Sequence, residues 1–343
     1  MSKPIRVLVV DDSAFARKVL REVLSASPEI EVVGIARDGL DALEKIEELK
    51  PDVVTLDLVM PNLDGLGLLR ALPADGAPRV VVVSMADEEG DLALSALREG
   101  AVELVHKPTA LAIDRLYELS NELVEKVRAA AIARPRRALA DPGARQRVVR
   151  QTGAGSPRVL VIGASTGGPQ AVRHLLKALP GDLPLPVALV LHIPVGFTES
   201  LAQRLDAESA LSVSEASDGA ELVPGSVLVA RAGIHLKLVD SGGTLRAVLD
   251  RAPANTPHRP AVDVLFESAV AACGGHVLAV VLTGMGDDGL VGSRAVHAAG
   301  GHVLTESEQS CVVYGMPRMV KEAGLSAAEA AIEGMAAEIL ARV

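Results

Sequence analysis

Aromatic side chains are almost absent from this chain, which has three Phe, two Tyr and no Trp among its 343 residues. Its cores must therefore be built mainly from Val, Leu, Ile and Ala, and hydrophobic residues make up 49% of the sequence. Cysteine is scarce too, since Cys273 and Cys311 are the two present, so we expect no disulfide framework. No apolar run approaches the roughly 20 residues of a membrane-spanning helix, so we expect no direct membrane insertion. The acidic residues at positions 11 and 12 come too early for a signal peptide, and together these absences favour a cytoplasmic protein.

The formal net charge of −10 argues against nucleic acid as the main partner. The charge is unevenly distributed, because residues 128–158 hold eight arginines and one acid, a net charge of +7. Such a basic segment could contact nucleic acid or an anionic membrane surface. We favour the simpler interpretation that it is a solvated linker beside acidic domains.

The first part of the chain alternates strand-like and helix-like segments. The predicted strands are 5–10, 30–36, 53–57, 80–84 and 101–106. The predicted helices are 14–26, 39–49, 64–72, 88–99 and 111–131. Five such repeats predict a five-stranded parallel sheet with helices on both faces. A stretch rich in Pro, Gly and Arg follows, which is typical of a linker.

The second part of the chain is a further α/β region. The predicted strands are 159–163, 187–192, 226–230, 235–239, 244–249, 276–282 and 301–305, with a hairpin turn at Asp240–Gly243. The predicted helices are 168–179, 197–207, 261–272, 288–299, 316–323 and 326–342. We therefore predict two doubly wound α/β domains, the second mostly parallel with a β-hairpin excursion. The predicted bounds are 1–127 and 158–343, with 128–157 as the linker.

Four apolar strand-like runs in the first domain each end in a residue with useful chemistry. These residues are Asp11 with Asp12, Asp57, Ser84 and Lys107. Because ligands bind outside the carboxyl ends of parallel strands, we expect these side chains to gather at one edge of the sheet. Clustered carboxylates repel each other unless a cation holds them, and their oxygens suit Mg²⁺. The amine and the hydroxyl are suited to contact the oxygens of a phosphoryl group.

This pattern resembles the receiver domain of bacterial two-component response regulators, over about residues 3–125. The resemblance implies that Asp57 accepts a phosphoryl group, that three carboxylates bind Mg²⁺ and that two further side chains contact the phosphoryl oxygens. By position these are Asp11, Asp12 and Asp57 for the metal, and Ser84 and Lys107 for the phosphoryl group.

The second domain opens with a strand, a tight turn and a helix start at Gly163–Pro169. Ser165 in this turn would be exposed at the top of the sheet, next to backbone N–H groups that could stabilise an oxyanion. A nucleotide-binding loop also has a glycine-rich turn after a strand, although the lysine of a P-loop and the G-x-G-x-x-G spacing are missing here. Taken alone, the turn leaves a serine nucleophile and nucleotide binding about equally favoured.

Two more predicted strands end in residues that complete a hydrolytic set. One ends at His192, and the other leads into Thr283–Gly289, which contains two aspartates. At one sheet edge a serine would attack, the histidine would transfer the proton and an aspartate would orient the imidazole. The chain order Ser–His–Asp differs from the order in α/β-hydrolases, so that fold fits poorly.

Five segments of the second domain resemble the chemotaxis protein-glutamate methylesterase family, which joins a receiver domain to a methylesterase domain through a linker. They are Gly163–Gly168, His192–Pro194 with Phe197-Thr198, Arg259–Asp263, Thr283–Gly289 and Tyr314–Pro317. The resemblance spans nearly the whole chain. It implies that Ser165 is the nucleophile, His192 the general base and Asp288 the orienting acid, because Asp287 fills a variable position of the family. It also implies that the Met285 N–H contacts the oxyanion and that Thr166 and His258 line the site.

The resemblance also implies a substrate and partners. The substrate would be a glutamate γ-methyl ester on the cytoplasmic helices of a chemoreceptor, and a chemotaxis histidine kinase would supply the phosphoryl group. Hydrolysis would release methanol, and deamidation of receptor glutamines is a plausible second activity. Mg²⁺ would serve phosphorylation of the receiver, and ester hydrolysis would need no cofactor. We expect the unphosphorylated receiver to block access to Ser165 and phosphorylation of Asp57 to relieve this block.

Other functions compete with this interpretation. The chain could be a receiver-controlled module that binds receptors without catalysis, although a complete set of triad residues argues against this. A nucleotide-binding signalling domain would use the turn at 163–168 but lacks the lysine. A DNA-binding response regulator is disfavoured, because the second half is long, rich in strands and without an evident helix-turn-helix.

Overall fold

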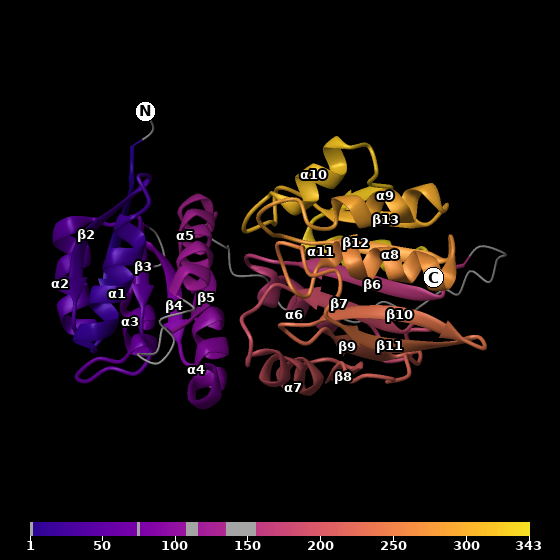
Figure 1. Ribbon diagram of the computed structural model, residues 1–343, viewed down its shortest axis with the longest axis horizontal. Helices are drawn as coiled ribbons and strands as arrows, with labels where there is room; N and C mark the ends of the chain where they lie inside the picture. The colour runs from indigo at the N-terminus through magenta and orange to yellow at the C-terminus, as the bar shows by residue number, and fades with distance from the viewer. Residues whose placement is uncertain (1–2, 74–75, 108–115, 135–155) are drawn as a thin grey trace. The chain divides into compact units, whose positions relative to one another are not determined.

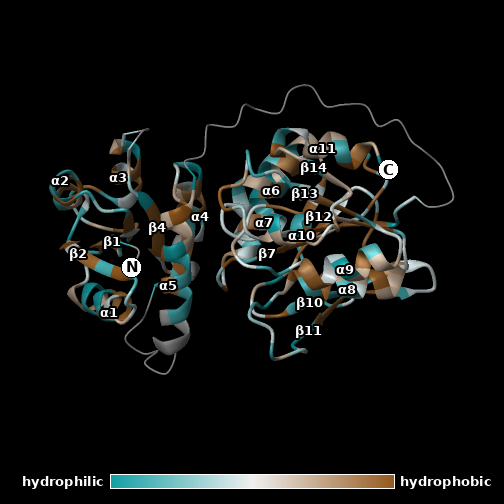
Figure 2. Cartoon of the chain, turned by 90° about the horizontal axis from the view of Figure 1, so that it is seen from above, coloured by the Kyte–Doolittle hydropathy of each residue, from teal (hydrophilic) through white to brown (hydrophobic). Residues whose placement is uncertain are grey.

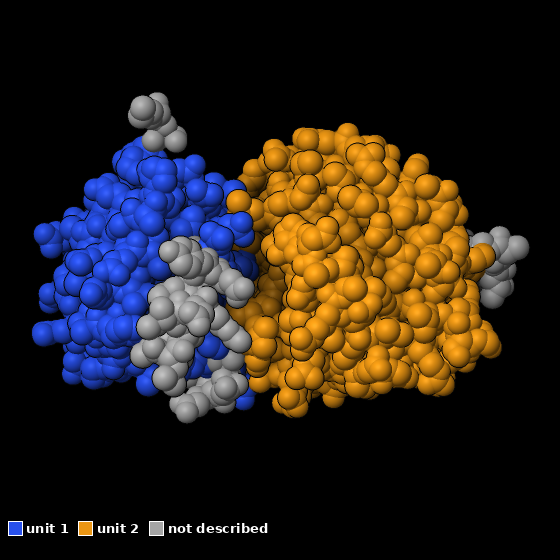
Figure 3. All heavy atoms as spheres, in the orientation of Figure 1, with its two compact units in different colours: residues 1–133 blue, residues 134–343 orange. Residues whose placement is uncertain are grey.

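The structure, a computed structural model, describes residues 3–73, 76–107, 116–134 and 156–343. It divides into two compact units, residues 1–133 and 134–343, which Figure 3 colours separately. The predicted domain boundary at residue 127 falls within helix α5 (Leu116–Ile132), and most of the predicted linker lies outside the described residues. Among the helices that are described, none is long and apolar enough to cross a membrane.

Unit 1 is a five-stranded parallel sheet in the order β2-β1-β3-β4-β5, as predicted (Figure 1). Its strands are β1 (Ile5–Val10), β2 (Ile30–Ala36), β3 (Val53–Leu56), β4 (Arg79–Ser84) and β5 (Glu103–His106). Its helices are α1 (Ala14–Ser25), α2 (Gly39–Leu49), α3 (Gly65–Ala71), α4 (Ala86–Arg98) and α5. Contacts between helices place α1 beside α5, and α3 beside both α2 and α4, so the sheet is covered on both faces. The predicted helix start at 111–115 lies outside the described residues.

Local sequence explains where the first three helices of unit 1 begin. The side chains of Ser13, Asp38 and Asp64 each accept a hydrogen bond from the backbone N–H three residues later. Such N-caps satisfy donors that a helix leaves unpaired in its first turn. Each cap therefore marks the point at which the loop after a strand ends and the helix begins.

Unit 2 has a seven-stranded sheet in the order β14-β13-β12-β6-β7-β9-β8, in which every neighbouring pair is parallel. Its strands are β6 (Val159–Ala164), β7 (Val187–Leu191), β8 (Ser212–Glu215), β9 (Ser226–Val229), β12 (Val277–Val281), β13 (His302–Glu306) and β14 (Ala328–Ala330). A separate antiparallel hairpin consists of β10 (His235–Ser241) and β11 (Thr244–Asp250). The predicted fold class, two α/β domains with a hairpin excursion in the second, is confirmed.

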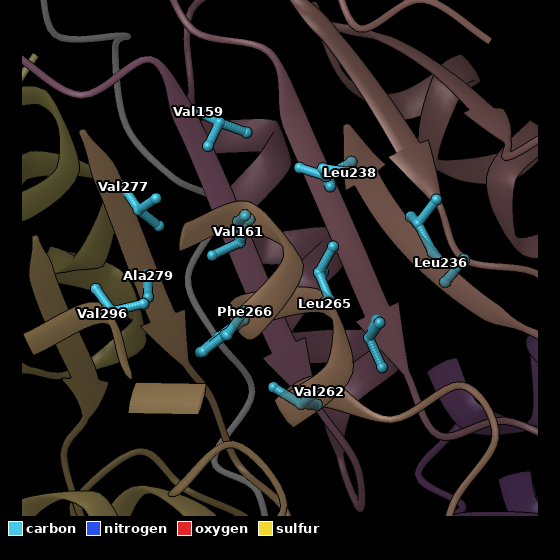
Figure 4. Packing of buried hydrophobic residues seen from close by; sticks show 14 of the residues in the cluster. Val159, Val161, Leu236, Leu238, Val262, Leu265, Phe266, Val277, Ala279 and Val296 are labelled. Carbon is cyan, nitrogen blue, oxygen red and sulfur yellow. The ribbon is translucent and has the colours of Figure 1, made fainter. Parts of the chain in front are cut away.

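Six helices cover the sheet in the described part of unit 2. They are α6 (Gly168–Ala178), α7 (Thr198–Glu208), α8 (Val262–Cys273), α9 (Leu290–Ala298), α10 (Met316–Glu322) and α11 (Ile332–Leu340). Contacts group α6 with α7 and α11, and α9 with α8 and α10, so both faces are covered. Figure 4 shows Leu265 and Phe266 of α8 over the valines of β6 and β12. Brown, apolar segments follow the strands in Figure 2, as expected where a parallel sheet is buried on both faces.

Two parts of unit 2 differ from the sequence prediction. The predicted helix 326–342 is wrong at its start, because Ala328–Ala330 forms β14 and the helix begins only at Ile332. The alanines favour a helix, but here they pair with Leu304–Glu306 of β13 at the edge of the sheet, so tertiary pairing overrides local propensity. Strand β8 was not predicted as a separate strand, because its polar residues at the opposite edge give little apolar signal.

Candidate functional site

Ser165 lies directly after β6, at the place in unit 2 where the strand order reverses between β6 and β12. This switch point is where open α/β sheets bind ligands. Its backbone N–H donates to the Thr283 carbonyl at 3.0 Å, which ties the turn to the loop after β12. Gly167 adopts a left-handed φ of +76°, and α6 starts at Gly168, so the predicted strand, turn and helix are present. Ser165 is buried, and its hydroxyl forms no hydrogen bond within the described residues.

His192 follows β7 and is held beside the serine turn by a hydrogen bond from its backbone N–H to the Ala164 carbonyl at 3.1 Å. Its Nε2 lies 2.9 Å from Oδ2 of Asp288, and the imidazole is buried with 7% of its side chain exposed. A carboxylate only accepts, so Nε2 carries the proton of this hydrogen bond, and in the neutral form of the ring Nδ1 keeps the lone pair. Nδ1 is buried and has no hydrogen-bond partner in the described part of the chain. The geometry therefore leaves Nδ1 as the basic nitrogen of this ring.

Asp288 lies in the loop before α9, and its carboxylate caps the N-terminus of α8. Its Oδ2 accepts from the Val262 N–H at 2.8 Å and its Oδ1 from the Asp263 N–H at 2.9 Å. Burial tends to raise the pKa of Asp288, but the hydrogen bond and charge of His192 and the two backbone donors hold the pKa below its ordinary value. The neighbouring Asp287 is exposed, and its side chain makes no hydrogen bond among the described residues. Of the two aspartates, Asp288 is the one joined to the histidine.

The loop after β12 lies against Ser165. A Cβ placed on Gly284 would be 2.8 Å from the Ser165 Cβ, so glycine is needed for this close approach. The backbone N–H groups of Met285 and Thr166 donate no hydrogen bond to any described residue. The Ser165 N–H is already used, whereas the N–H groups of Met285 and Thr166, which lie in the loop after β12 and in the serine turn, remain available as donors.

His258 stacks on His192. The two rings have centroids 4.0 Å apart and planes 24° apart. The His258 ring therefore lies against one face of the His192 ring. The structure thus brings together five of the predicted site residues of unit 2 around Ser165, namely Thr166, His192, His258, Met285 and Asp288.

The predicted acidic site of unit 1 forms at the carboxyl end of its sheet. Strand register pairs Val10 with Leu56, which sets the following residues, Asp11 and Asp57, side by side. Ligand atoms of Asp11, Asp12 and Asp57 all lie within 4.8 Å of one another. Such a set of clustered carboxylate oxygens fits a hard divalent cation such as Mg²⁺.

Lys107 lies between the two buried carboxylates of this cluster. Its Nζ is 2.6 Å from Asp57 Oδ2 and 3.0 Å from Asp11 Oδ2. Burial alone would lower the pKa of Lys107, but the two aspartates raise it above its ordinary value. Burial raises the pKa of Asp11, against the opposing effect of Lys107. The Ser84 carbonyl accepts from the Lys107 N–H at 2.9 Å, which holds the ends of β4 and β5 together.

Comparison with known proteins places both units. Residues 160–339 match the family model of the CheB methylesterase, and residues 7–119 match that of the response regulator receiver domain. A Myxococcus xanthus (strain DK1622) protein named protein-glutamate methylesterase/protein-glutamine glutaminase 5 is 63% identical over 338 residues, 97% of each chain. The chain belongs to the CheB methylesterase family.

Other members of the CheB methylesterase family agree with this assignment. A Thermotoga maritima protein named protein-glutamate methylesterase/protein-glutamine glutaminase is 43% identical over 321 residues, 93% of each chain. The crystal structure of the Thermotoga maritima CheB methylesterase catalytic domain superimposes with a TM-score of 0.54 and 39% sequence identity, over 55% of this chain and 100% of that one.

Two acidic residues of this CheB methylesterase family member were not predicted to have a role at the site. From the sequence, Asp263 was noted only as part of a segment that resembles the family. Its position in the first turn of a predicted helix was a possible signal, because acidic residues there often interact with unpaired backbone N–H groups. Glu306 ends β13, is fully buried and accepts from the Thr283 N–H at 2.8 Å. Its position behind the loop depends on the order of β12 and β13 in the sheet, which the sequence did not specify.

Proposed function

We propose that this protein is a phosphorylation-controlled protein-glutamate methylesterase. It hydrolyses glutamate γ-methyl esters on the cytoplasmic helices of chemoreceptors, releases methanol and also deamidates receptor glutamines. The observation that carries the proposal is the 2.9 Å hydrogen bond between His192 and Asp288, beside the Ser165 turn, in a chain of the CheB methylesterase family. The bounds 1–127 and 158–343, joined by 128–157, remain our proposal for its two domains and linker.

The proposed reaction begins with attack of Ser165 Oγ on the ester carbonyl carbon. The hydroxyl proton passes to Nδ1 of His192, and Asp288 stabilises the imidazolium that forms. The Met285 and Thr166 N–H groups donate to the developing oxyanion. Collapse of the tetrahedral intermediate breaks the bond to the methoxy group, which takes the proton from His192 and leaves as methanol.

Water completes the proposed cycle. It attacks the acyl carbonyl and gives one proton to His192, which passes it to Ser165 Oγ as the acyl bond to the serine breaks. The glutamate product then loses its carboxyl proton to solvent. A glutamine carboxamide has a similar shape and enters the same path with ammonia as the leaving group. The nitrogen of an amide is a poorer leaving group than the methoxy group of an ester. We therefore expect deamidation to be slower than ester hydrolysis.

The receiver unit supplies the proposed control. Asp57 takes the phosphoryl group from a histidine kinase. The oxygen cluster of Asp11, Asp12 and Asp57 would hold Mg²⁺, which would supply positive charge beside the phosphoryl oxygens. Lys107 and Ser84 would contact the phosphoryl oxygens. This chemistry belongs to unit 1, and the residues around Ser165 need no cofactor in the mechanism above.

Replacing Asp57 with asparagine tests the control step. Acetyl phosphate with Mg²⁺ is expected to raise methanol release by the wild-type protein, whereas the Asp57→Asn protein should show no increase. The amide is a poor nucleophile, so no acyl phosphate forms. A matched Asp52→Asn protein, altered in an aspartate of the same unit that caps the Arg6 N–H, should still respond. An undiminished response of Asp57→Asn would place the phosphoryl group elsewhere.

Replacing His258 with alanine tests the stacked histidine pair. An aromatic pair contributes about 0.5–1.5 kcal/mol, so we expect kcat to fall about 2- to 13-fold if the His258 ring orients that of His192. The exposed His297 of α9 provides the control, since His297→Ala removes a histidine of the same unit away from the stack. Equal rates for the two variants would show that the stacking does not orient His192.

The rival function is receptor binding without catalysis. Membranes that carry chemoreceptors with labelled methyl esters distinguish the two. Release of labelled methanol by the wild-type protein supports the esterase, and co-sedimentation with the membranes without release would favour the binding module.

A further inference from the structure

The N-termini of α8 and α9 in unit 2 are each capped by a carboxylate from the neighbouring segment. Asp288 precedes α9, and its carboxylate binds the first two N–H groups of α8. Asp263 belongs to α8, and its Oδ1 accepts from the Gly289 N–H at 2.9 Å and from the Gly292 N–H at 2.7 Å, both at the start of α9. The N-terminus of α8 therefore binds the carboxylate of Asp288, and the N-terminus of α9 binds the carboxylate of Asp263.

We propose that Asp263 is a positioning residue for Asp288. It fixes the start of α9, and so the carboxylate of Asp288, at the distance and angle that the His192 imidazole requires. This inference rests on the proposed function of the Ser165 site. Asp263 touches neither the histidine nor Ser165 through any hydrogen bond in the described structure, so it acts through Asp288.

The start of α9 depends on Asp263 because it has no capping side chain of its own. Its N-cap is Gly289, which adopts a left-handed φ of +99° and offers no side-chain acceptor. Without Asp263, two N–H groups at this end would lose their partner. Asp288, directly before Gly289, would then lose one of the constraints on its position.

Close packing of α8 and α9 sets the reach of the Asp263 side chain. A Cβ on Gly292 would lie 2.5 Å from the Phe266 Cβ and 3.1 Å from the Asp263 Cα, so the two helices approach as closely as glycine allows. A carboxylate on a side chain one methylene longer cannot keep the same two hydrogen bonds without moving α9. The geometry thus fits aspartate, or its isostere asparagine, and excludes glutamate.

The charge of Asp263 is costly where it stands. Burial raises its pKa from 3.8 to about 6, with the negative charges of Asp288 and Glu267 adding to the effect, although the Gly289 and Gly292 donors oppose it. The unfolded chain loses this proton at lower pH than the folded protein, so the contribution of Asp263 to stability falls as pH rises from about 4 to about 6. Asparagine escapes this cost, and we expect Asp263→Asn to be at least as heat-stable as the wild type at pH 8.

Three variants of the full-length protein test the proposal by release of labelled methanol from methylated receptor membranes. Asp263→Asn keeps the Oδ1 acceptor and should retain kcat within about threefold. Asp263→Glu keeps the charge but displaces the acceptor, and Asp263→Ala removes it, so both should lose kcat about 10- to 100-fold with little change in KM. Asp218→Ala is the matched control, because Asp218 also accepts a backbone N–H, that of Leu249, elsewhere in unit 2.

The order of the variants decides the outcome. If Asp263→Asn is much more active than Asp263→Glu and Asp263→Ala, the result supports the proposal that the Oδ1 acceptor positions Asp288. Full activity of Asp263→Ala overturns the proposal, as does a glutamate variant that surpasses the asparagine variant, because charge rather than geometry would then matter. The asparagine and glutamate variants both keep a polar side chain at this position, so their comparison tests the proposal even if the alanine protein is unstable. A wild-type protein that releases no methanol would instead contradict the proposed function itself.

Discussion

The Ser165→Ala protein is expected to release methanol about 10⁶-fold more slowly than the wild type, which places it at the detection limit of most assays. The substitution removes the nucleophile and leaves its surroundings in place. The hydrogen bond from the backbone N–H to the Thr283 carbonyl does not depend on the side chain, and the hydroxyl makes no other bond among the described residues. Receptor membranes with labelled methyl esters provide the assay.

A serine elsewhere in unit 2 gives the control for this loss. Ser209 caps the end of α7, where its hydroxyl donates to the Leu211 carbonyl, and Ser209→Ala should retain the wild-type rate. Thermal unfolding should change little for Ser165→Ala, because one buried hydroxyl without a partner is lost. A residual rate within 10-fold of the wild type would mean that another group attacks the ester.

Asp288→Asn is expected to lower kcat about 10⁴-fold, a loss of the size seen when a triad aspartate becomes an amide. Asp288 Oδ2 faces the Val262 N–H and the protonated Nε2 of His192, while Oδ1 faces the Asp263 N–H. An asparagine amide group on the Oδ2 side would turn towards Nε2 and shift the proton of the ring to Nδ1, which then cannot act as base. In the opposite orientation the amide group would face the Asp263 N–H, donor against donor.

The adjacent aspartate is a close control for this variant. Asp287→Asn changes an exposed side chain in the same loop and should alter kcat by less than about twofold. Steady-state methanol release by both proteins, with circular dichroism to check folding, makes the comparison. If Asp287→Asn proved the slower of the two, the assignment of the orienting acid would have to move to Asp287.

Much of the fold was accessible from sequence because each buried strand is a continuous apolar run. β1, β3 and β4 are rich in apolar residues. β1 and β4 end at the residues predicted, and β3 ends one residue earlier, at Leu56. The helix starts at Ser13, Asp38 and Asp64 carry their own capping signals. The edges of the second sheet were less accessible. β8 is polar and β14 consists of alanines and a glutamate, so both depend on a neighbouring strand rather than on their own sequence.

The site shows the same division between local and tertiary information. Strand-end positions pointed to Ser165, His192 and the pair of aspartates, because loops at the carboxyl ends of parallel strands converge. Which ring nitrogen of His192 meets Asp288 depends on the direction from which α9 approaches, and no local pattern encodes that direction. The exchange between Asp263 and Asp288 likewise requires α8 and α9 to be neighbours, which the chain order alone does not state.

Methanol release from methylated receptor membranes, with and without acetyl phosphate and Mg²⁺, tests the central claim most directly. We predict that the wild-type protein releases methanol, that the phosphodonor raises the rate and that Ser165→Ala releases none under either condition. Release that depends on Ser165 but ignores the phosphodonor would contradict control by the receiver. No release from the wild-type protein across several receptors would contradict the esterase itself.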